Sequence, residues 1–389
     1  MNGYSRRLFL QLSGVATVGT LIRPHSAHAE DDPFALLRRR WRDVTAGSGF
    51  DAAAEPYRTR LAELGTAAAG YRDAMAPAGA SLWPDLAFPS FTATPARLRT
   101  MARAYALPGT TVDPYRLPGT TVSTRRLADG AGEEWGDTCP PGRWVGGATD
   151  GTYATVGQHL NGFESTMEAF KSWFFLDDAV VCLGAAITGE DGVPVETVVD
   201  NRRTDAFLTV DDRAGWAHLE GHGGYVVPCA RLHTLREERT GGPEPVTRSY
   251  VTLWLDHGVD PGSAGYVYLL LPGASLARTR ARAADPGWAR VLANTARRQG
   301  VRIPSLGITA VNFWNDGAAG GLTASAPCAV LVRELGDGTA TLTVSDPRRD
   351  LDGLTVTWDR PVTEVLRGHP LLTGAATGAR LTLAFGRLS

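Results

Sequence analysis

Cysteine, long apolar runs and clustered positive charge are all scarce in this chain of 389 residues. It has four cysteines, and no two of them show the Cys-x-x-Cys spacing that is typical of a zinc site. Beyond the first thirty residues, no apolar run approaches the roughly 20 residues that a membrane-spanning helix needs. No cluster of Lys and Arg indicates a nucleic-acid partner, and a net charge of −2 gives a polyanion no long-range attraction. We therefore expect no metal or other cofactor, no nucleic acid and no membrane, and an anionic ligand would need local arginines.

The surroundings of the cysteines differ. Cys182 and Cys328 lie in apolar, strand-like segments, which predicts thiols buried in a core. Cys139 and Cys229 have no such pattern, and the sequence is compatible both with a disulfide between them and with two free thiols.

The first thirty residues are typical of a targeting signal. Ser5-Arg6-Arg7-Leu8-Phe9-Leu10 has the twin-arginine pattern, an apolar run follows over residues 12–22, and Ala27-His28-Ala29 matches an Ala-x-Ala cleavage site. The alternative is a short membrane anchor, but the run is shorter than the roughly 20 residues of a spanning helix. We predict a twin-arginine signal peptide over residues 1–29 and an extracellular mature protein.

Residues 30–106 have helical periodicity. Apolar side chains recur there at three- and four-residue spacing in three stripes: Phe34/Leu37/Trp41, Tyr57/Leu61/Leu64 and Leu98/Met101/Tyr105. These stripes predict three helices that form a thin layer and need a partner surface. We expect them either to pack near Tyr115 or to leave an apolar face uncovered, which would favour self-association.

A short sequence is repeated where the helical pattern ends. Leu-Pro-Gly-Thr-Thr-Val occupies residues 107–112 and again residues 117–122. The simpler interpretation is a pair of similar Pro-Gly turns. The other is a junction at which a large internal segment has been lost.

From Val122 onward the pattern is that of β-strands. Ala169–Leu176 and Ala179–Ile187 are predicted strands joined by a turn at Asp177 and Asp178, and a third strand ends at Asp200, which together suggest an antiparallel meander. Further strands are expected at residues 248–255, 265–271, 339–344, 354–358 and 380–385. Asp285–Gln299 is the exception, because Trp288, Val291, Leu292 and Thr295 have helical spacing.

These patterns predict a mainly β protein with a large antiparallel β-sandwich. We expect a short α-helical N-terminal layer over residues 30–106, a central sandwich over residues 107–300, and a small C-terminal β domain over residues 301–389.

Eight segments resemble, in the right order, segments of polysaccharide lyase family 8, the hyaluronate, chondroitin and xanthan lyases. They are Ser81–Asp85, Arg97–Tyr105, Asp113–Val122, residues 168–202, Leu232–Gly241, Tyr250–Gly258, Tyr266–Ser275 and Ala310–Trp314. The resemblance implies the β-sandwich half of such an enzyme, preceded by the first helices of the family's α/α toroid. Its ligand would be an acidic polysaccharide that contains uronate.

The residues that carry out the family's reaction are not found. The family cleaves beside a uronate by β-elimination, for which an asparagine, a histidine, a tyrosine and an arginine of the toroid neutralise the carboxylate and move the protons. None of the segments that carry them occurs here, and the nearest echo, Asn161-Gly162-Phe163-Glu164, lies beyond the Pro-Gly-Thr-Thr motif. We therefore assign no catalytic residue, and we expect an inactive or impaired lyase. The alternative is a non-catalytic carbohydrate-binding or accessory β-sandwich protein.

The remaining histidines offer weak substitutes. His257 lies near Tyr250 and His233 near Arg236, but a lone histidine in a strand is more often a packing residue. His218 and His222 have the spacing of helical metal ligands, although Gly221, Gly223 and Gly224 argue against a helix there. Glu237, Glu238 and Arg239 are expected to form ion pairs on a strand face.

Tryptophan supplies the candidate glycan-stacking residues. Trp135 and Trp144 lie in a Gly/Pro-rich segment and are the candidate carbohydrate-binding pair, because sugar rings stack on flat aromatic faces. The alternative is that both cap the core of the sandwich. Trp173, Trp254 and Trp314 lie in apolar runs and are expected in the core.

Overall fold

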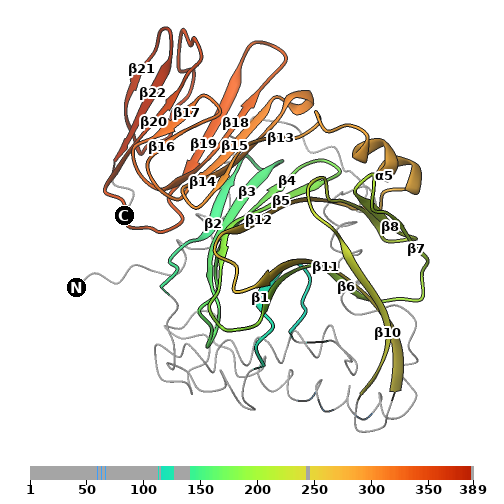
Figure 1. Cartoon of the computed structure of the whole chain (residues 1–389). Coiled ribbons are helices and arrows are strands. Elements are labelled where there is room, and N and C mark those ends of the chain that lie inside the picture. Colours follow the sequence, from blue (N-terminus) through green and yellow to red (C-terminus); the bar gives the residue numbers. More distant parts are fainter. Residues whose placement is uncertain are drawn as a thin grey trace.

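The computed structural model describes residues 113, 115–126, 141–241 and 246–386, with three isolated helical positions, Thr59, Glu63 and Thr66. These residues form four antiparallel sheets stacked face to face (Figure 1). The prediction of a mainly β protein with sandwiched sheets and a C-terminal β domain is confirmed. The expected signal peptide, nearly all of the helical segment, Trp135 and Cys139 lie outside the described residues.

The first two sheets make up the large sandwich. The first has the order β1 (Thr121–Ser123), β6 (Pro194–Arg203), β11 (Val246–Val259) and β10 (His233–Gly241). The second has the order β2 (Val145–Thr149), β3 (Ala154–Asn161), β4 (Glu168–Phe175), β5 (Val180–Thr188), β12 (Ala264–Pro272), β9 (Gly223–Val226), β8 (Trp216–Leu219) and β7 (Leu208–Asp211).

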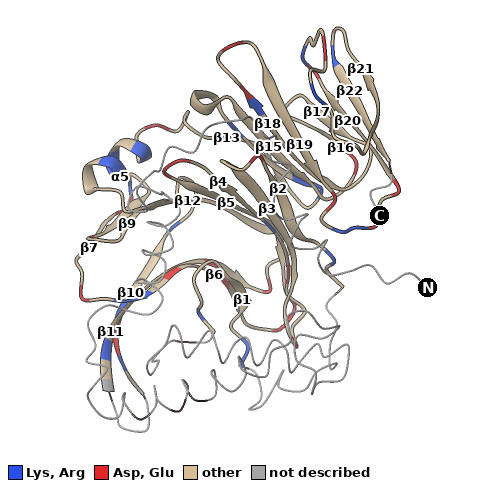
Figure 2. Cartoon of the chain, turned by 180° about the vertical axis from the view of Figure 1, so that it is seen from behind, with Lys and Arg blue, Asp and Glu red and all other residues tan. Residues whose placement is uncertain are grey.

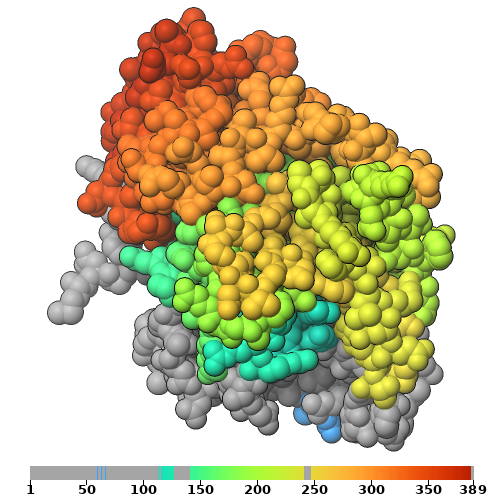
Figure 3. Space-filling model, in the orientation of Figure 1, coloured from blue at the N-terminus to red at the C-terminus, as the bar shows by residue number. Residues whose placement is uncertain are grey.

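The other two sheets form the C-terminal part, orange to red in Figure 3. The third has the order β13 (Arg290–Thr295), β14 (Arg298–Ile303), β15 (Ile308–Phe313), β18 (Cys328–Glu334) and β19 (Ala340–Ser345). The fourth has the order β16 (Gly317–Ala319), β17 (Leu322–Ala324), β20 (Gly353–Trp358), β22 (Leu381–Gly386) and β21 (Leu372–Ala376). A short 3₁₀-helix, Pro304–Leu306, separates β14 from β15, and β14 spans the boundary expected at residues 300 and 301.

The stacking explains why the central strands have almost continuous apolar sequences. Because side chains alternate along a strand, a strand covered on both sides is apolar at successive positions. In β5, Val181 and Leu183 belong to the core that faces the third sheet, whereas Cys182 belongs to the core that faces the first. In β18, Leu331 faces the second sheet and Cys328 faces the fourth. Both cysteines have no exposed surface, as predicted, and Cys229 is exposed and free.

The second copy of the repeated sequence forms a Pro-Gly turn that is fixed to both of the first two sheets. Gly119 has a φ of +79°, a conformation that favours glycine, and its amide donates to Val198 O on β6 at 2.7 Å. Its carbonyl accepts a hydrogen bond of 2.6 Å from Lys171 Nζ on β4. Lys171 is only 1% exposed, so the turn covers a buried amine.

One predicted strand pairing and one predicted helix are wrong. The strand that ends near Asp200 does not complete a meander, because β6 crosses to the first sheet and pairs there with β1 and β11. The helix predicted over Asp285–Gln299 is instead a turn followed by the hairpin β13–β14. A register shift between Val291 and Ala293 inserts an extra residue, which makes the apolar spacing of this strand look helical.

The one α-helix that is described along its whole length lies just before that segment. This helix, α5 (Leu276–Ala283), begins at Ser275, whose side chain accepts a hydrogen bond from Arg278 N. Arg278 and Arg282 both pair with Asp178, which holds the helix against the turn between β4 and β5. Blue marks this basic helix in Figure 2, where other charged residues are spread over strands and loops. Within the described residues, no helix has the length and apolar character to cross a bilayer.

Candidate functional site

The outward face of the first sheet collects polar and aromatic side chains. Tyr250, Thr252 and Trp254 alternate on β11 with Val251 and Leu253, which face the core. Their register partners on β10 are Glu237, Leu235 and His233. Since alternation places these partners on the same side of the sheet, the sequence of these two strands builds a face that is unlike the apolar face beneath it.

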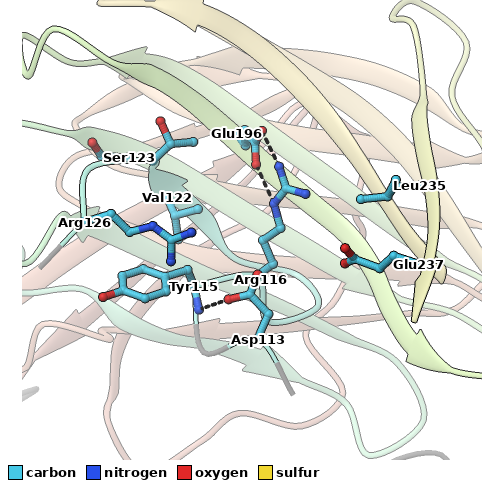
Figure 4. Close-up of a pocket in the computed structure, with 10 residues that line it drawn as sticks. Asp113, Tyr115, Arg116, Val122, Ser123, Arg126, Glu196, Leu235 and Glu237 are labelled. Carbon is cyan, nitrogen blue, oxygen red and sulfur yellow. Dashed lines mark hydrogen bonds and ion pairs between the residues drawn. The ribbon is translucent and has the colours of Figure 1, made fainter. Parts of the chain in front are cut away.

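A pocket of about 310 Å³ lies where this face meets the segment before β1. Ten residues line it: Asp113, Tyr115, Arg116, Val122, Ser123, Thr124, Arg126, Glu196, Leu235 and Glu237. Figure 4 shows Arg116 between the Tyr115–Arg126 pair and the β10 residues Leu235 and Glu237.

Arg116 is the most firmly held side chain of the pocket. Its Nε and Nη2 donate to the two carboxylate oxygens of Glu196 at 3.0 and 2.8 Å, a bidentate pair. Its guanidinium also lies 4.7 Å from the centre of the Trp254 ring, and His233 stacks on Trp254 with ring centres 5.3 Å apart. Trp254 thus serves to position Arg116.

A second arginine organises the β10 side of the face. Arg239 donates to Glu237 Oε1 at 2.8 and 2.6 Å, to Thr252 Oγ1 at 3.0 Å and to Asn201 Oδ1 at 3.2 Å. Its guanidinium also lies over the Tyr250 ring at 4.3 Å. The ion pairs expected on this strand are therefore present between Glu237 and Arg239.

The opposite wall is built by the segment that leads into β1. Asp113 Oδ1 accepts a hydrogen bond of 2.9 Å from Tyr115 N, which fixes a turn, and the Arg126 guanidinium lies 4.8 Å from the centre of the Tyr115 ring. Among the described residues, no ion pair involves Asp113 or Arg126.

The histidines proposed as substitute bases are packing residues. Nε2 of His257 lies 2.8 Å from Thr197 Oγ1, and burial, the largest cause, lowers the pKa of this imidazole to about 4. Its ring stacks near that of Tyr266, with ring centres 6.0 Å apart, but Tyr266 is 3% exposed between the first two sheets. A polymer cannot reach this pair.

The two histidines with metal-ligand spacing point to separate partners. Nδ1 of His218 lies 3.2 Å from Thr279 Oγ1 on α5, and Nε2 of His222 lies 3.1 Å from Thr204 Oγ1. They sit on a strand and the following turn, as the glycines suggested. Over the ranges that the structure describes, no group of three or more His, Cys, Asp and Glu side chains could hold a metal ion.

Trp144 does not offer a face to a sugar. Its side chain is 2% exposed, its Nε1 donates to Gly146 O at 3.0 Å, and its ring packs edge-on against Trp314 at 4.7 Å. This is the core-capping alternative, and it arises because the third sheet covers the start of β2. Trp314 is buried as expected, whereas Trp173 and Trp254 are partly exposed.

The pocket itself was not predicted. Tyr115, Arg116 and the turn after them belong to one of the segments with family resemblance, but the sequence gives no sign that β10 and β6 bring Glu237 and Glu196 to the same place. An arginine and tyrosine next to a Pro-Gly turn was the only local signal.

Comparison with known proteins agrees with this architecture. A family model described as the polysaccharide lyase family 8 super-sandwich domain matches residues 103–283, and one for the C-terminal beta-sandwich domain of that family matches residues 290–355. The described sheets are therefore those of a polysaccharide lyase scaffold. The chain belongs to polysaccharide lyase family 8.

Three relatives illustrate the similarity. A hyaluronate lyase of Thermasporomyces composti is 49% identical over 311 residues, and a xanthan lyase of Bacillus sp. (strain GL1) is 36% identical over 241 residues. The solved structure of the Streptomyces coelicolor A3 chondroitin AC lyase in complex with chondroitin sulphate has 58% identity and a TM-score of 0.68.

The matched region makes up less than half of the length of each of these relatives. It covers 72% of this chain and 38% of the hyaluronate lyase, 52% of this chain and 26% of the xanthan lyase, and 71% of this chain and 38% of the chondroitin AC lyase.

Proposed function

We propose that this chain binds a uronate-containing polysaccharide of the hyaluronan, chondroitin or xanthan type and that, by itself, it cleaves the polymer poorly or not at all. Membership of the lyase family and similarity to a lyase solved with chondroitin sulphate support the choice of ligand. One observation carries the proposed loss of activity. No histidine of the described ranges lines the pocket between β1 and β10, so the pocket itself offers no imidazole base.

The chemistry explains why this observation matters. Removing the weakly acidic proton beside a uronate carboxylate requires a base within hydrogen-bond reach and a donor that neutralises the carboxylate. Besides the four histidines described above, His159 lies 2.5 Å from Glu168 and stacks on Phe170, and His369 Nδ1 accepts from Leu371 N at 3.2 Å. The sequence also lacks the family's catalytic segments, and groups that act as a unit are not replaced by the scaffold.

The first test is a lyase assay. Purified chain is incubated with hyaluronan, chondroitin sulfate and xanthan, and the ultraviolet absorbance of the unsaturated uronate product is followed. We expect no increase above a boiled-protein blank. Turnover comparable to that of an intact family enzyme run in parallel would overturn the proposed loss of activity.

The second test measures binding without turnover. The chain is passed over a chondroitin sulfate gel and over a neutral dextran gel, and elution is followed against salt. We expect retention on the acidic gel alone. This outcome, without product formation, would favour the carbohydrate-binding or accessory role, and passage through both gels would contradict the proposed ligand.

We also propose export through a cleaved twin-arginine signal. The support is the Arg6-Arg7 motif and the Ala27-His28-Ala29 site of the sequence. N-terminal sequencing of protein from culture medium should begin at Glu30. Recovery only from the cytoplasm, with an intact N-terminus, would contradict export.

A further inference from the structure

The charges that line the pocket at β1 and β10 largely cancel. Glu196 pairs with Arg116 through both carboxylate oxygens, and Glu237 pairs with Arg239 at 2.6 Å from just outside the pocket. Asp113 and Arg126 remain, one of each sign. The pocket therefore has no excess of positive charge, although its polysaccharide ligand is proposed to be anionic.

The lining of this pocket is unfavourable for a carboxylate ligand. It would have to sit among Asp113, Glu196 and Glu237, and Arg126 is the one lining cation that is not held by a carboxylate among the described residues. Like charges at short range oppose binding, and Arg116 would have to give up a bidentate bond to help.

Hydroxyl groups fit the same lining much better. Asp113 uses Oδ1 for the Tyr115 amide, and Glu237 uses Oε1 for Arg239, so each has a second oxygen that can accept from a sugar hydroxyl. The Arg126 guanidinium can donate to a ring or hydroxyl oxygen. Tyr115, Val122 and Leu235 supply the apolar surface against which the C–H face of a sugar ring packs.

We infer that this pocket holds one uncharged, hydroxyl-rich sugar ring of the N-acetylhexosamine class, and not a uronate. The inference rests on the proposed polysaccharide ligand, because hyaluronan and unsulfated chondroitin carry a neutral N-acetylhexosamine between successive uronates. A volume of about 310 Å³ is at the small end for ligand sites, which suits a single ring. The anionic units of the polymer would lie outside the pocket.

A pair of matched probes tests the inference. Binding of methyl N-acetyl-β-galactosaminide and methyl β-glucuronide to the full chain is measured by chemical-shift titration, with saturation-transfer NMR to show which probe protons contact the protein. We expect the neutral probe to bind at least about tenfold more tightly, since only the glucuronide must place its charge among carboxylates.

The substitution Asp113→Asn should lower the affinity of the pocket for a neutral sugar, whereas it would raise the affinity for a uronate. It keeps the acceptor for the Tyr115 amide but removes a negative charge, so it should weaken the neutral probe about threefold to tenfold through the lost charge-assisted hydrogen bond. If the pocket held a uronate, the same change would strengthen the glucuronide. Asp337→Asn is the matched control, because Asp337 Oδ1 likewise accepts from the amide two residues on, at 2.9 Å, in a remote turn.

The outcomes separate the two proposals. Preference for the glucuronide, or a gain of its affinity in Asp113→Asn, would overturn the assignment of the pocket. Absence of binding by both probes would also overturn it, while retention on the chondroitin sulfate gel would still stand as the separate measure of polysaccharide binding.

Discussion

The second sheet has two buried faces, and they handle polar groups in opposite ways. On the side of the third sheet, Asn312 donates to Val156 O at 3.1 Å and to Ser172 Oγ at 2.9 Å, and it accepts from Thr155 Oγ1 at 3.0 Å. Ser172 in turn donates to Gln299 Oε1 at 2.7 Å, and Gln299 continues the chain to Asn294. Each amide in this network has both of its N–H groups bonded, which keeps the cost of burial low.

On the side of the first sheet, ionisable groups are buried instead. Lys171 is 1% exposed and donates one hydrogen bond, to Gly119 O, and burial lowers its pKa to about 7. His257 lies nearby, and its pKa is lowered mainly by burial and further by the charge of Lys171. The amide network on one face of the second sheet is therefore neutral at every pH and has all of its N–H groups bonded. On the other face, burial shifts the pKa of Lys171 and His257, so the stability of the fold depends on pH there.

The largest expected effect is the loss of a network member. Asn312→Ala leaves Val156 O, Ser172 and Thr155 without a partner in a dry interface, so we expect the free energy of unfolding to fall by about 3–5 kcal/mol. Urea unfolding followed by tryptophan fluorescence measures it. Asn315→Ala, at an exposed position three residues further on, should change stability by less than about 0.5 kcal/mol.

A smaller effect is expected from His257 at acidic pH. Its pKa is about 4 in the folded state and about 6.5 in the unfolded chain, so between these values only the unfolded state binds the proton. Stability should therefore decrease as the pH falls from 6.5 to 4, by about 3 kcal/mol from this residue.

The measurement for His257 is a set of urea midpoints at pH 4.5, 5.5 and 7. His257→Gln should reduce the loss at low pH, because an amide can still bond to Thr197 without taking a proton. His369→Gln, at an exposed position, is the control and should follow the wild type. Identical pH profiles for wild type and His257→Gln would contradict the assignment.

The smallest effect concerns Lys171 at mildly alkaline pH. Its pKa is about 7 when folded and about 10.4 when unfolded, so the unfolded state alone holds the proton between these values and stability rises with pH. From pH 7 to 8.5 the gain should be about 2 kcal/mol. Above that range the thiols of Cys182 and Cys328, whose pKa values are raised to about 12 by burial, act in the opposite direction.

Lys171→Met should abolish this rise, while the difference between variant and wild type should stay constant from pH 5.5 to about 6, where the amine is charged in both states. Thermal unfolding midpoints at four pH values are sufficient. A wild-type midpoint that does not change between pH 7 and 8.5, with a parallel curve for the variant, would contradict a buried amine that must lose its proton.

The sequence was informative where a single strand reports on its own surroundings. The bounds of β5 and β12 were predicted to within one residue, because the burial of a strand determines the residue type at each position. The strand predicted at residues 248–255 lies inside the longer β11. The sheet to which β6 belongs depends on a crossover between sheets, and no short sequence pattern indicates such a crossover. The helix α5 was not predicted, although Ser275 is a good N-cap. The apolar spacing of the bulged strand β13 led to a helix being predicted at Asp285–Gln299 instead.

The candidate site was much harder to predict. Residue type alone indicated Trp144 and the histidines as candidates. In the structure, the side chains of Trp144, His257, His218 and His222 all have hydrogen-bond partners within the fold. The pocket depends on Glu196 and Glu237 arriving beside Arg116 from strands 80 or more residues away in sequence. Such a meeting follows from sheet order and register, which no local pattern encodes.

The burial of Lys171 has a practical consequence for covalent labelling. Lys171 is the only lysine of the sequence, and the other 38 of its 39 Lys and Arg residues are arginines. An amine-reactive ester added to the folded chain thus finds no accessible side chain, and only the α-amino group reacts. Modification at residue 171 occurs only when the Pro-Gly turn and the first sheet move away from β4. Mass spectrometry of the labelled peptide then records how often this one interface opens.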